Sequence, residues 1–150
     1  MEPDARSVPG EPGPAGEPGP ATSVAAPTPT TVTHRRYVPF SHAHYAGNLV
    51  DGAYVLALFG DVATELCIRI DGDEGLFASY SSVEFRAPVR GGDVIEATAT
   101  LVRKGRRSRE LEFVARVVCR SRPDRGPGAA EALPEPLLVT TARGTVVVPG

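Results

Sequence analysis

The sequence predicts an α+β domain in which one buried helix packs against an antiparallel sheet. A long apolar run from 49 to 70 spreads its apolar residues around the whole helical circumference, as a buried helix does. Four segments rich in Val, Ala, Phe and Thr follow it and are separated by Pro and Gly turn signals, as is typical of antiparallel strands. The expected strands span 75–89, 93–103, 109–120 and 137–148.

The ends of the helix and an earlier strand complete the pattern. Asn48 is the expected N-cap, and Asp71 with Gly72 is expected to end the helix. Before the helix, 35–40 can form a short edge strand, because an edge strand tolerates a proline such as Pro39. A sheet curled around one helix is the simplest way to bury that helix, and this arrangement is the hot-dog architecture. Such a sheet leaves one edge open and the helix partly uncovered, so we expect at least a dimer, with a plain α+β roll as the alternative.

The first 33 residues are expected to lie outside this domain, which would span 34–150. Residues 1–30 contain 8 of the 15 prolines and no Leu, Ile, Phe, Tyr or Trp, so this segment cannot bury enough surface to fold. Glycine recurs at every third position over four triplets, which is too short a repeat for a triple helix. The segment also lacks the pattern of a secretion signal. We therefore expect a flexible Pro/Gly-rich tail.

Composition narrows the function classes. With 150 residues there is room for one domain, and a formal net charge of -2 gives no overall basic field for nucleic acid. No stretch of about 20 apolar residues exists that could span a membrane. Cys67 and Cys119 lie far apart in apolar segments, which fits reduced thiols in a cytoplasmic protein. We therefore expect a cytoplasmic single-domain protein that binds neither nucleic acid nor membrane.

Three carboxylates interrupt the apolar helix and are the first candidates for chemistry. Asp51, Asp61 and Glu65 lie near one stripe of the helix, and burying a carboxylate without a partner is costly. For Asp61 and Glu65 the alternative is pairing with arginines such as Arg86 or Arg116 at a subunit interface. Asp51 differs because it lies in the first turn, where free backbone N–H groups and the helix dipole can hold a developing negative oxygen.

Two further segments carry reactive or charged side chains. His42 and His44 precede the helix, and each can be an active-site or hydrogen-bonding histidine or a structural one. A zinc site is the third interpretation. No third ligand with metal-like spacing is apparent, so no metal is expected. The turn at 103–109 has five positive side chains, including Arg106 and Arg107 beside Ser108. It suits a phosphate-bearing ligand, and the alternative is a solvated hairpin tip.

Two sequence blocks resemble a known family. The first is Ala43-His44-Tyr45 followed by GNLVDGA at 47–53, and the second is LFGDVATEL at 58–66. Both are similar to the hot-dog-fold 3-aminobutyryl-CoA and β-alanyl-CoA ammonia-lyases, and the resemblance covers residues 40–120. Its later parts, including the turn with Gly105 and Ser108, recur in hot-dog thioesterases, so they imply the fold and CoA recognition rather than the reaction.

The resemblance implies reversible β-elimination of ammonia from a short β-aminoacyl-CoA, with CoA as part of the substrate and no separate cofactor. Removing the proton α to a thioester needs a base and a stabiliser for the enolate oxygen. We expect the helix start to supply the stabiliser, with Asp51 and Glu84 as the base and the ammonium partner in either order. Side chains alternate along a strand, so Glu84 lies on the opposite face of the sheet from Val83 and Phe85. The sequence leaves open which of these two faces meets the cleft of the dimer.

The remaining expectations complete the site. His44 would orient a group or carry a proton, and the basic turn would bind the CoA phosphates in a homodimer or a dimer-based hexamer. The alternatives are an acyl-CoA thioesterase, whose carboxylate would activate water, and a CoA-binding module without catalysis. The expected substrate-binding residues are Gly47, Asn48, Gly52, Asp61 and Glu65, and the expected CoA-binding residues are Arg106, Arg107 and Ser108.

Overall fold

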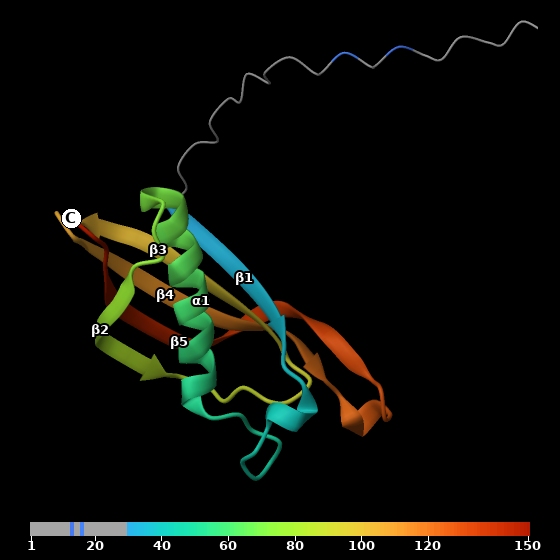
Figure 1. Cartoon of the computed structure of the whole chain (residues 1–150). Helices are drawn as coiled ribbons and strands as arrows, with labels where there is room; N and C mark the ends of the chain where they lie inside the picture. Colours follow the sequence, from blue (N-terminus) through green and yellow to red (C-terminus); the bar gives the residue numbers. More distant parts are fainter. Residues whose placement is uncertain (1–12, 14–15, 17–29) are drawn as a thin grey trace, which may run out of the picture.

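The computed structural model describes residues 13, 16 and 30–150, so most of the expected tail lies outside the described residues. Five strands form one sheet in the order β1-β3-β4-β5-β2, and every neighbouring pair is antiparallel (Figure 1). The elements are β1 (Thr31–Tyr37), η1 (Phe40–His42), α1 (Gly52–Asp71), β2 (Leu76–Phe85), β3 (Val94–Lys104), β4 (Ser108–Ser121), η2 (Pro123–Arg125) and β5 (Ala130–Val147).

The helix α1 lies along one face of the curved sheet, which confirms the hot-dog fold (Figure 1). Its apolar side faces the sheet, and at the centre of the core the rings of Phe59 and Phe113 stack with centroids 5.0 Å apart. The other side of the helix is exposed, including Ala57 and Ile68. The sheet therefore covers one side of the helix only and leaves the other side uncovered in one chain, as expected for this architecture. The buried helical residues are Val55, Leu58, Phe59, Val62, Ala63, Leu66 and Cys67.

The two ends of α1 differ in how well the sequence located them. The C-terminal end is confirmed, since Gly72 caps the helix with a left-handed φ of 67°. The predicted N-cap, Asn48, is wrong, because Asp51 caps the helix by accepting from the Tyr54 N–H. Asn48 has a φ of 60° and donates its side-chain N–H to the Gly91 carbonyl oxygen over 2.9 Å. It therefore shapes the loop before the helix instead of capping it.

Two strands begin earlier than the sequence indicated. β1 starts at Thr31, inside the segment assigned to the tail, because Thr31 pairs with Thr100 of β3. β5 starts at Ala130, inside the stretch of 121–136 that we expected to be a turn, because Ala130 pairs with Ser121 of β4. The β4–β5 hairpin consequently extends as an arm beyond the other strands, with η2 at its tip (Figure 1).

A buried ion pair ties the C-terminal end of α1 to the β3–β4 hairpin. Arg109 donates from Nε and Nη2 to the two carboxylate oxygens of Asp71, at 2.8 and 2.7 Å. Its Nη1 donates to the carbonyl oxygens of Gly105 and Ser108. Only 5% of the Arg109 side chain and 12% of the Asp71 side chain are exposed. Arg109 therefore holds the hairpin in place and is not available to a ligand.

The start of β1 allows a sharp test of the tail boundary. Deleting residues 1–29 is expected to leave Tm unchanged, because the pairing of β1 with β3 begins at Thr31. Deleting residues 1–33 is expected to lower Tm, since it removes the pairs that Thr31, Val32 and Thr33 make with β3. Thermal unfolding of both truncations checks this expectation, and equal Tm values would contradict the boundary.

Candidate active site

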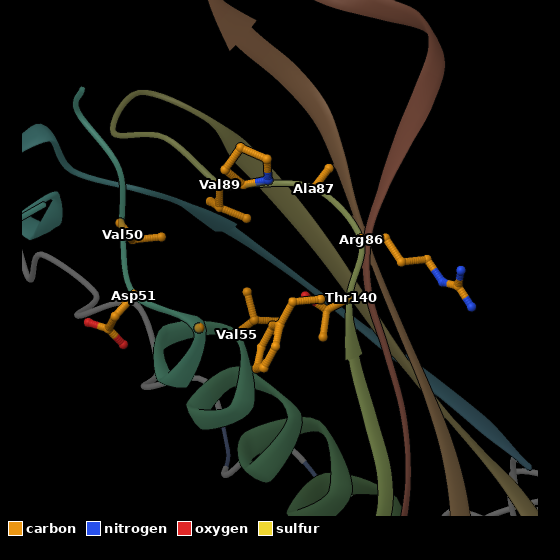
Figure 2. A pocket seen from close by; sticks show the side chains of 10 residues that line it. Val50, Asp51, Val55, Arg86, Ala87, Val89 and Thr140 are labelled. Carbon is orange, nitrogen blue, oxygen red and sulfur yellow. The ribbon is translucent and has the colours of Figure 1, made fainter. Parts of the chain in front are cut away.

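A pocket of about 420 Å³ opens at the N-terminal end of α1, between the helix start and the strand β2 (Figure 2). Most of its surface is apolar, and Asp51, Arg86 and Thr140 are its polar side chains. Figure 2 shows the Arg86 side chain pointing away from the helix. The lining residues are Val50, Asp51, Gly52, Val55, Phe85, Arg86, Ala87, Pro88, Val89 and Thr140.

The first turn of α1 presents open backbone donors at this pocket. The N–H groups of Gly52 and Ala53 form no hydrogen bond to another residue that the structure describes, as is usual for the first residues of a helix. Gly52 also packs so closely against Phe85 that a Cβ at position 52 would lie 2.7 Å from the Phe85 ring. The helix start can therefore hold an anionic oxygen at the pocket.

Asp51 and His44 form a hydrogen-bonded pair beside these donors. One Asp51 oxygen accepts from the Tyr54 N–H over 2.9 Å, and the other lies 2.5 Å from His44 Nε2. The hydrogen bond from His44 holds the pKa of Asp51 below its usual range, and the Tyr54 N–H lowers this pKa further. An ionised carboxylate only accepts hydrogen bonds, so Nε2 carries the proton and Nδ1 of a neutral His44 keeps a lone pair.

The structure does not bring Glu84 to the pocket. Alternation along β2 turns Phe85 toward Gly52 and turns Glu84 to the other face of the sheet, where it lines a separate hollow with Glu112 and Arg143. Within one chain Glu84 and Asp51 therefore line different pockets, and their shared role in one site stays a prediction. Within the chain Arg86 Nη2 donates to Glu84, and the alternative that Arg86 pairs with the helix carboxylates at a subunit interface stays a prediction.

Asp61 and Glu65 are paired with β1 along the side of α1. Arg36 Nη2 donates to Asp61 over 2.8 Å, and Nε2 of His34 lies 3.0 Å from a Glu65 oxygen. The hydrogen bond that Arg69 donates, followed by the one from His34, keeps the pKa of Glu65 below its usual range. Neither carboxylate lines the pocket, and their expected contact with substrate stays a prediction.

The other candidates near the helix start lie beside the pocket and not in it. Gly47 and Asn48 line a neighbouring hollow of about 240 Å³. Nδ1 of His42 lies 3.0 Å from the Tyr54 hydroxyl, so His42 and His44 have separate partners. In the part of the chain that the structure describes, no three or more His, Cys, Asp or Glu side chains gather where a metal ion could bind.

The basic turn lies at the opposite end of α1 from the pocket. Lys104 Nζ is 3.6 Å from Asp71, the last residue of the helix, while Arg106 and Arg107 are exposed. A helix of 20 residues is about 30 Å long, so one chain does not present the turn and Asp51 to the same part of a ligand.

Sequence reasoning missed the apolar walls of the pocket and one polar residue in them. Phe85 and Thr140 are paired in the β2–β5 ladder, which sets both beside the helix start. Alternation along β5 predicts that Thr140 lies on the same face as the buried Ala142. The strand register that brings Thr140 to the helix start depends on pairing with distant strands, and the sequence does not reveal it.

Comparisons with known proteins agree with this architecture. The thioesterase superfamily model matches residues 47–121. A relative from Acetoanaerobium sticklandii, named 3-aminobutyryl-CoA ammonia lyase, is 53% identical over 107 residues, which are 71% of this chain and 85% of the relative. The matched segment of the superfamily model includes the helix start, Asp51 and the basic turn.

Two solved structures are similar to the whole domain. The β-alanyl-CoA:ammonia lyase from Clostridium propionicum superposes with a TM-score of 0.75 at 37% identity, over 79% of this chain and 84% of that one. A hexameric hot-dog thioesterase of Campylobacter jejuni has a TM-score of 0.64 at 19% identity, over 78% of this chain and 81% of that one, and supports the fold alone. The chain therefore belongs to the thioesterase superfamily and, within it, to the family of the CoA-thioester ammonia lyases.

Proposed function

We propose that this protein catalyses the reversible β-elimination of ammonia from a short β-aminoacyl-CoA of the 3-aminobutyryl-CoA type. The observation that carries the proposal is the open N-terminal end of α1 at an apolar pocket, with the Asp51–His44 pair beside it. The names of the relatives from Acetoanaerobium sticklandii and Clostridium propionicum support the same reaction. The reaction uses CoA as part of the substrate and requires no other cofactor.

The helix start would stabilise the intermediate of this reaction. With the thioester carbonyl oxygen at the N–H groups of Gly52 and Ala53, the negative charge that develops after removal of the α-proton lies at the positive end of the helix dipole. The acyl chain then extends into the apolar pocket between Val55 and Phe85. A volume of about 420 Å³ leaves room for this chain.

His44 is the proposed base, and Asp51 is its positioning residue. Both Asp51 oxygens already accept hydrogen bonds, one from the helix and one from His44, whereas Nδ1 of His44 has its lone pair available. The α-proton moves to this nitrogen, and the C–N bond to the protonated β-amino group breaks with its electron pair leaving on neutral ammonia. This assignment replaces the pairing of Asp51 with Glu84.

The position of the basic turn supports a site completed by a second copy of the chain. An antiparallel neighbour would place its turn, at the C-terminal end of its α1, near the N-terminal end of the first helix. The exposed side of α1 leaves room for such a neighbour. We therefore propose a homodimer, or a hexamer built from dimers, in which the turn of one protomer binds the CoA phosphates at the pocket of its partner.

Replacing both Arg106 and Arg107 by Ala is expected to raise KM for the CoA thioester much more than it lowers kcat. Phosphate contacts far from the reacting atoms are equally strong in the ground state and the transition state. Steady-state kinetics at low salt measures the effect, with Arg35→Ala on β1 as a control for the loss of an exposed arginine elsewhere on the chain. An unchanged KM in the double variant would contradict the proposal that the turn binds CoA.

Incubation with crotonyl-CoA and ammonium tests the reaction directly. Mass spectrometry is expected to detect 3-aminobutyryl-CoA, and a thiol reagent is expected to detect no release of free CoA. Release of free thiol from acyl-CoA substrates without ammonia addition would instead identify a thioesterase. The absence of both products would favour a CoA-binding module.

A further inference from the structure

The pocket contains one buried hydroxyl group that the reaction described above does not use. Thr140 lies on β5, is 1% exposed and lines the pocket (Figure 2). It is paired with Phe85 of β2 on one side and with Ala115 of β4 on the other. A threonine at this position places a polar atom among side chains that are mostly apolar.

The Thr140 hydroxyl has no hydrogen-bond partner among residues 30–150, although the other buried polar side chains do. Asp93 accepts from Arg120, and Arg109 donates to Asp71. Within the same residues, every completely inaccessible side-chain nitrogen or oxygen atom has a partner. Because the Thr140 oxygen has no partner, it is not one of these completely inaccessible atoms. The small exposed area of Thr140 therefore includes this oxygen, and the oxygen is accessible from the pocket that Thr140 lines.

A buried hydroxyl without a partner is unfavourable for folding, so its partner is expected to come from a ligand. Valine has nearly the same shape and would fill this position without that cost. The chain thus keeps a polar atom where a ligand, and not the protein, can satisfy it. The pocket around Thr140 otherwise offers Val55 and Phe85 as apolar walls.

We propose that the Thr140 hydroxyl oxygen accepts a hydrogen bond from the β-nitrogen of the substrate. This inference rests on the proposed function, because it takes the thioester oxygen to lie at the start of α1. The acyl chain then enters the pocket, and its amino group is the polar atom that can reach Thr140.

The same contact serves both directions of the reaction. In elimination the protonated β-nitrogen donates one N–H to Thr140 and leaves with the C–N electron pair as neutral ammonia, while the α-proton goes to the base. In addition an ammonia molecule that donates one N–H to Thr140 keeps its lone pair available for the β-carbon. Thr140 would thereby position the ammonia molecule for attack on the β-carbon.

The experiment compares Thr140→Val with the matched control Thr141→Val. The next residue, Thr141, lines the hollow on the other face of the sheet, so the control removes a hydroxyl outside the pocket. Addition of ammonia to crotonyl-CoA is followed at varied concentrations of each reactant. For Thr140→Val we expect KM for ammonia to rise about 10-fold or more, which corresponds to the loss of one hydrogen bond to the reacting group. KM for crotonyl-CoA and the behaviour of Thr141→Val should stay as in the wild type.

Thermal unfolding provides the second readout. Since the hydroxyl has no protein partner, Thr140→Val is expected to keep or raise Tm. An unchanged KM for ammonia, or a rise confined to KM for crotonyl-CoA, would overturn the inference, as would a Tm drop that accounts for the lost activity. A wild-type protein that adds no ammonia would overturn the proposed function and this inference together, whereas an active wild type with an unaffected Thr140→Val variant would overturn the inference alone.

Discussion

Replacing Asp51 by Asn is expected to lower the rate of ammonia elimination by about 10²–10⁴-fold, the usual effect of losing a positioned base. The carbonyl oxygen of Asn can still accept from the Tyr54 N–H and cap the helix. Its NH₂ group would then face His44 Nε2, which must become an acceptor. That reverses the tautomer, so Nδ1 carries the proton and cannot remove one.

Stability measurements separate this effect from unfolding. The Asp51→Asn variant should keep its Tm, its oligomeric state and its affinity for CoA, because Asn is among the best capping residues. His44→Gln should lose a similar factor, and the double variant should be no slower than either single variant, as expected for two residues that act as a unit. Full activity of Asp51→Asn would remove the pair from the mechanism.

Replacing Arg109 by Met is expected to lower the free energy of unfolding by about 3 kcal/mol or more, since it leaves a mostly buried carboxylate without its main partner. Asp71 is the last residue of α1, where the helix dipole disfavours a negative charge. The hydrogen bonds from Arg109 keep the pKa of Asp71 below its usual range. The remaining partner of Asp71, Lys104, is 3.6 Å away and 54% exposed, so it compensates little.

The pH dependence of stability provides an independent measurement. Because the pKa of Asp71 is lower in the folded chain, its contribution is fully present above the ordinary pKa of an aspartate and is lost as the pH falls through the folded value. The Arg109→Met variant should lose part of this acid sensitivity. Urea unfolding at equal protein concentration compares it with Arg35→Met, which breaks the exposed pair with Glu96 and should cost less than about 1 kcal/mol. Equal losses in both variants would contradict the role of the buried pair.

The elements that the sequence located best are those with local signals. Asp71 and Gly72 mark the end of α1 because a left-handed glycine cap is visible in the sequence. The N-cap was misplaced because Asn48 and Asp51 are equally good capping residues. What separates them is the long-range hydrogen bond from Asn48 to Gly91, 43 positions away, which no local pattern reveals.

The site was predictable only where it follows from the helix. The position of Asp51 in the first turn indicated its place beside open N–H donors, and the neighbouring His44 is its observed partner. The placement of Glu84 depended on which face of β2 meets the helix, and the buried hydroxyl of Thr140 depended on strand register. Sheet faces and registers are decided by contacts between segments far apart in the chain, so the sequence alone left them open.

The contact between Gly52 and Phe85 limits how the acyl specificity could be re-engineered. Any side chain at position 52 would collide with the Phe85 ring, so the helix start cannot be varied on its own. Phe85 ends β2 and is 58% exposed, which makes it the wall that can be trimmed with the least damage to the core. A library for longer or branched acyl groups should therefore begin with smaller residues at position 85 and vary position 52 only in their presence.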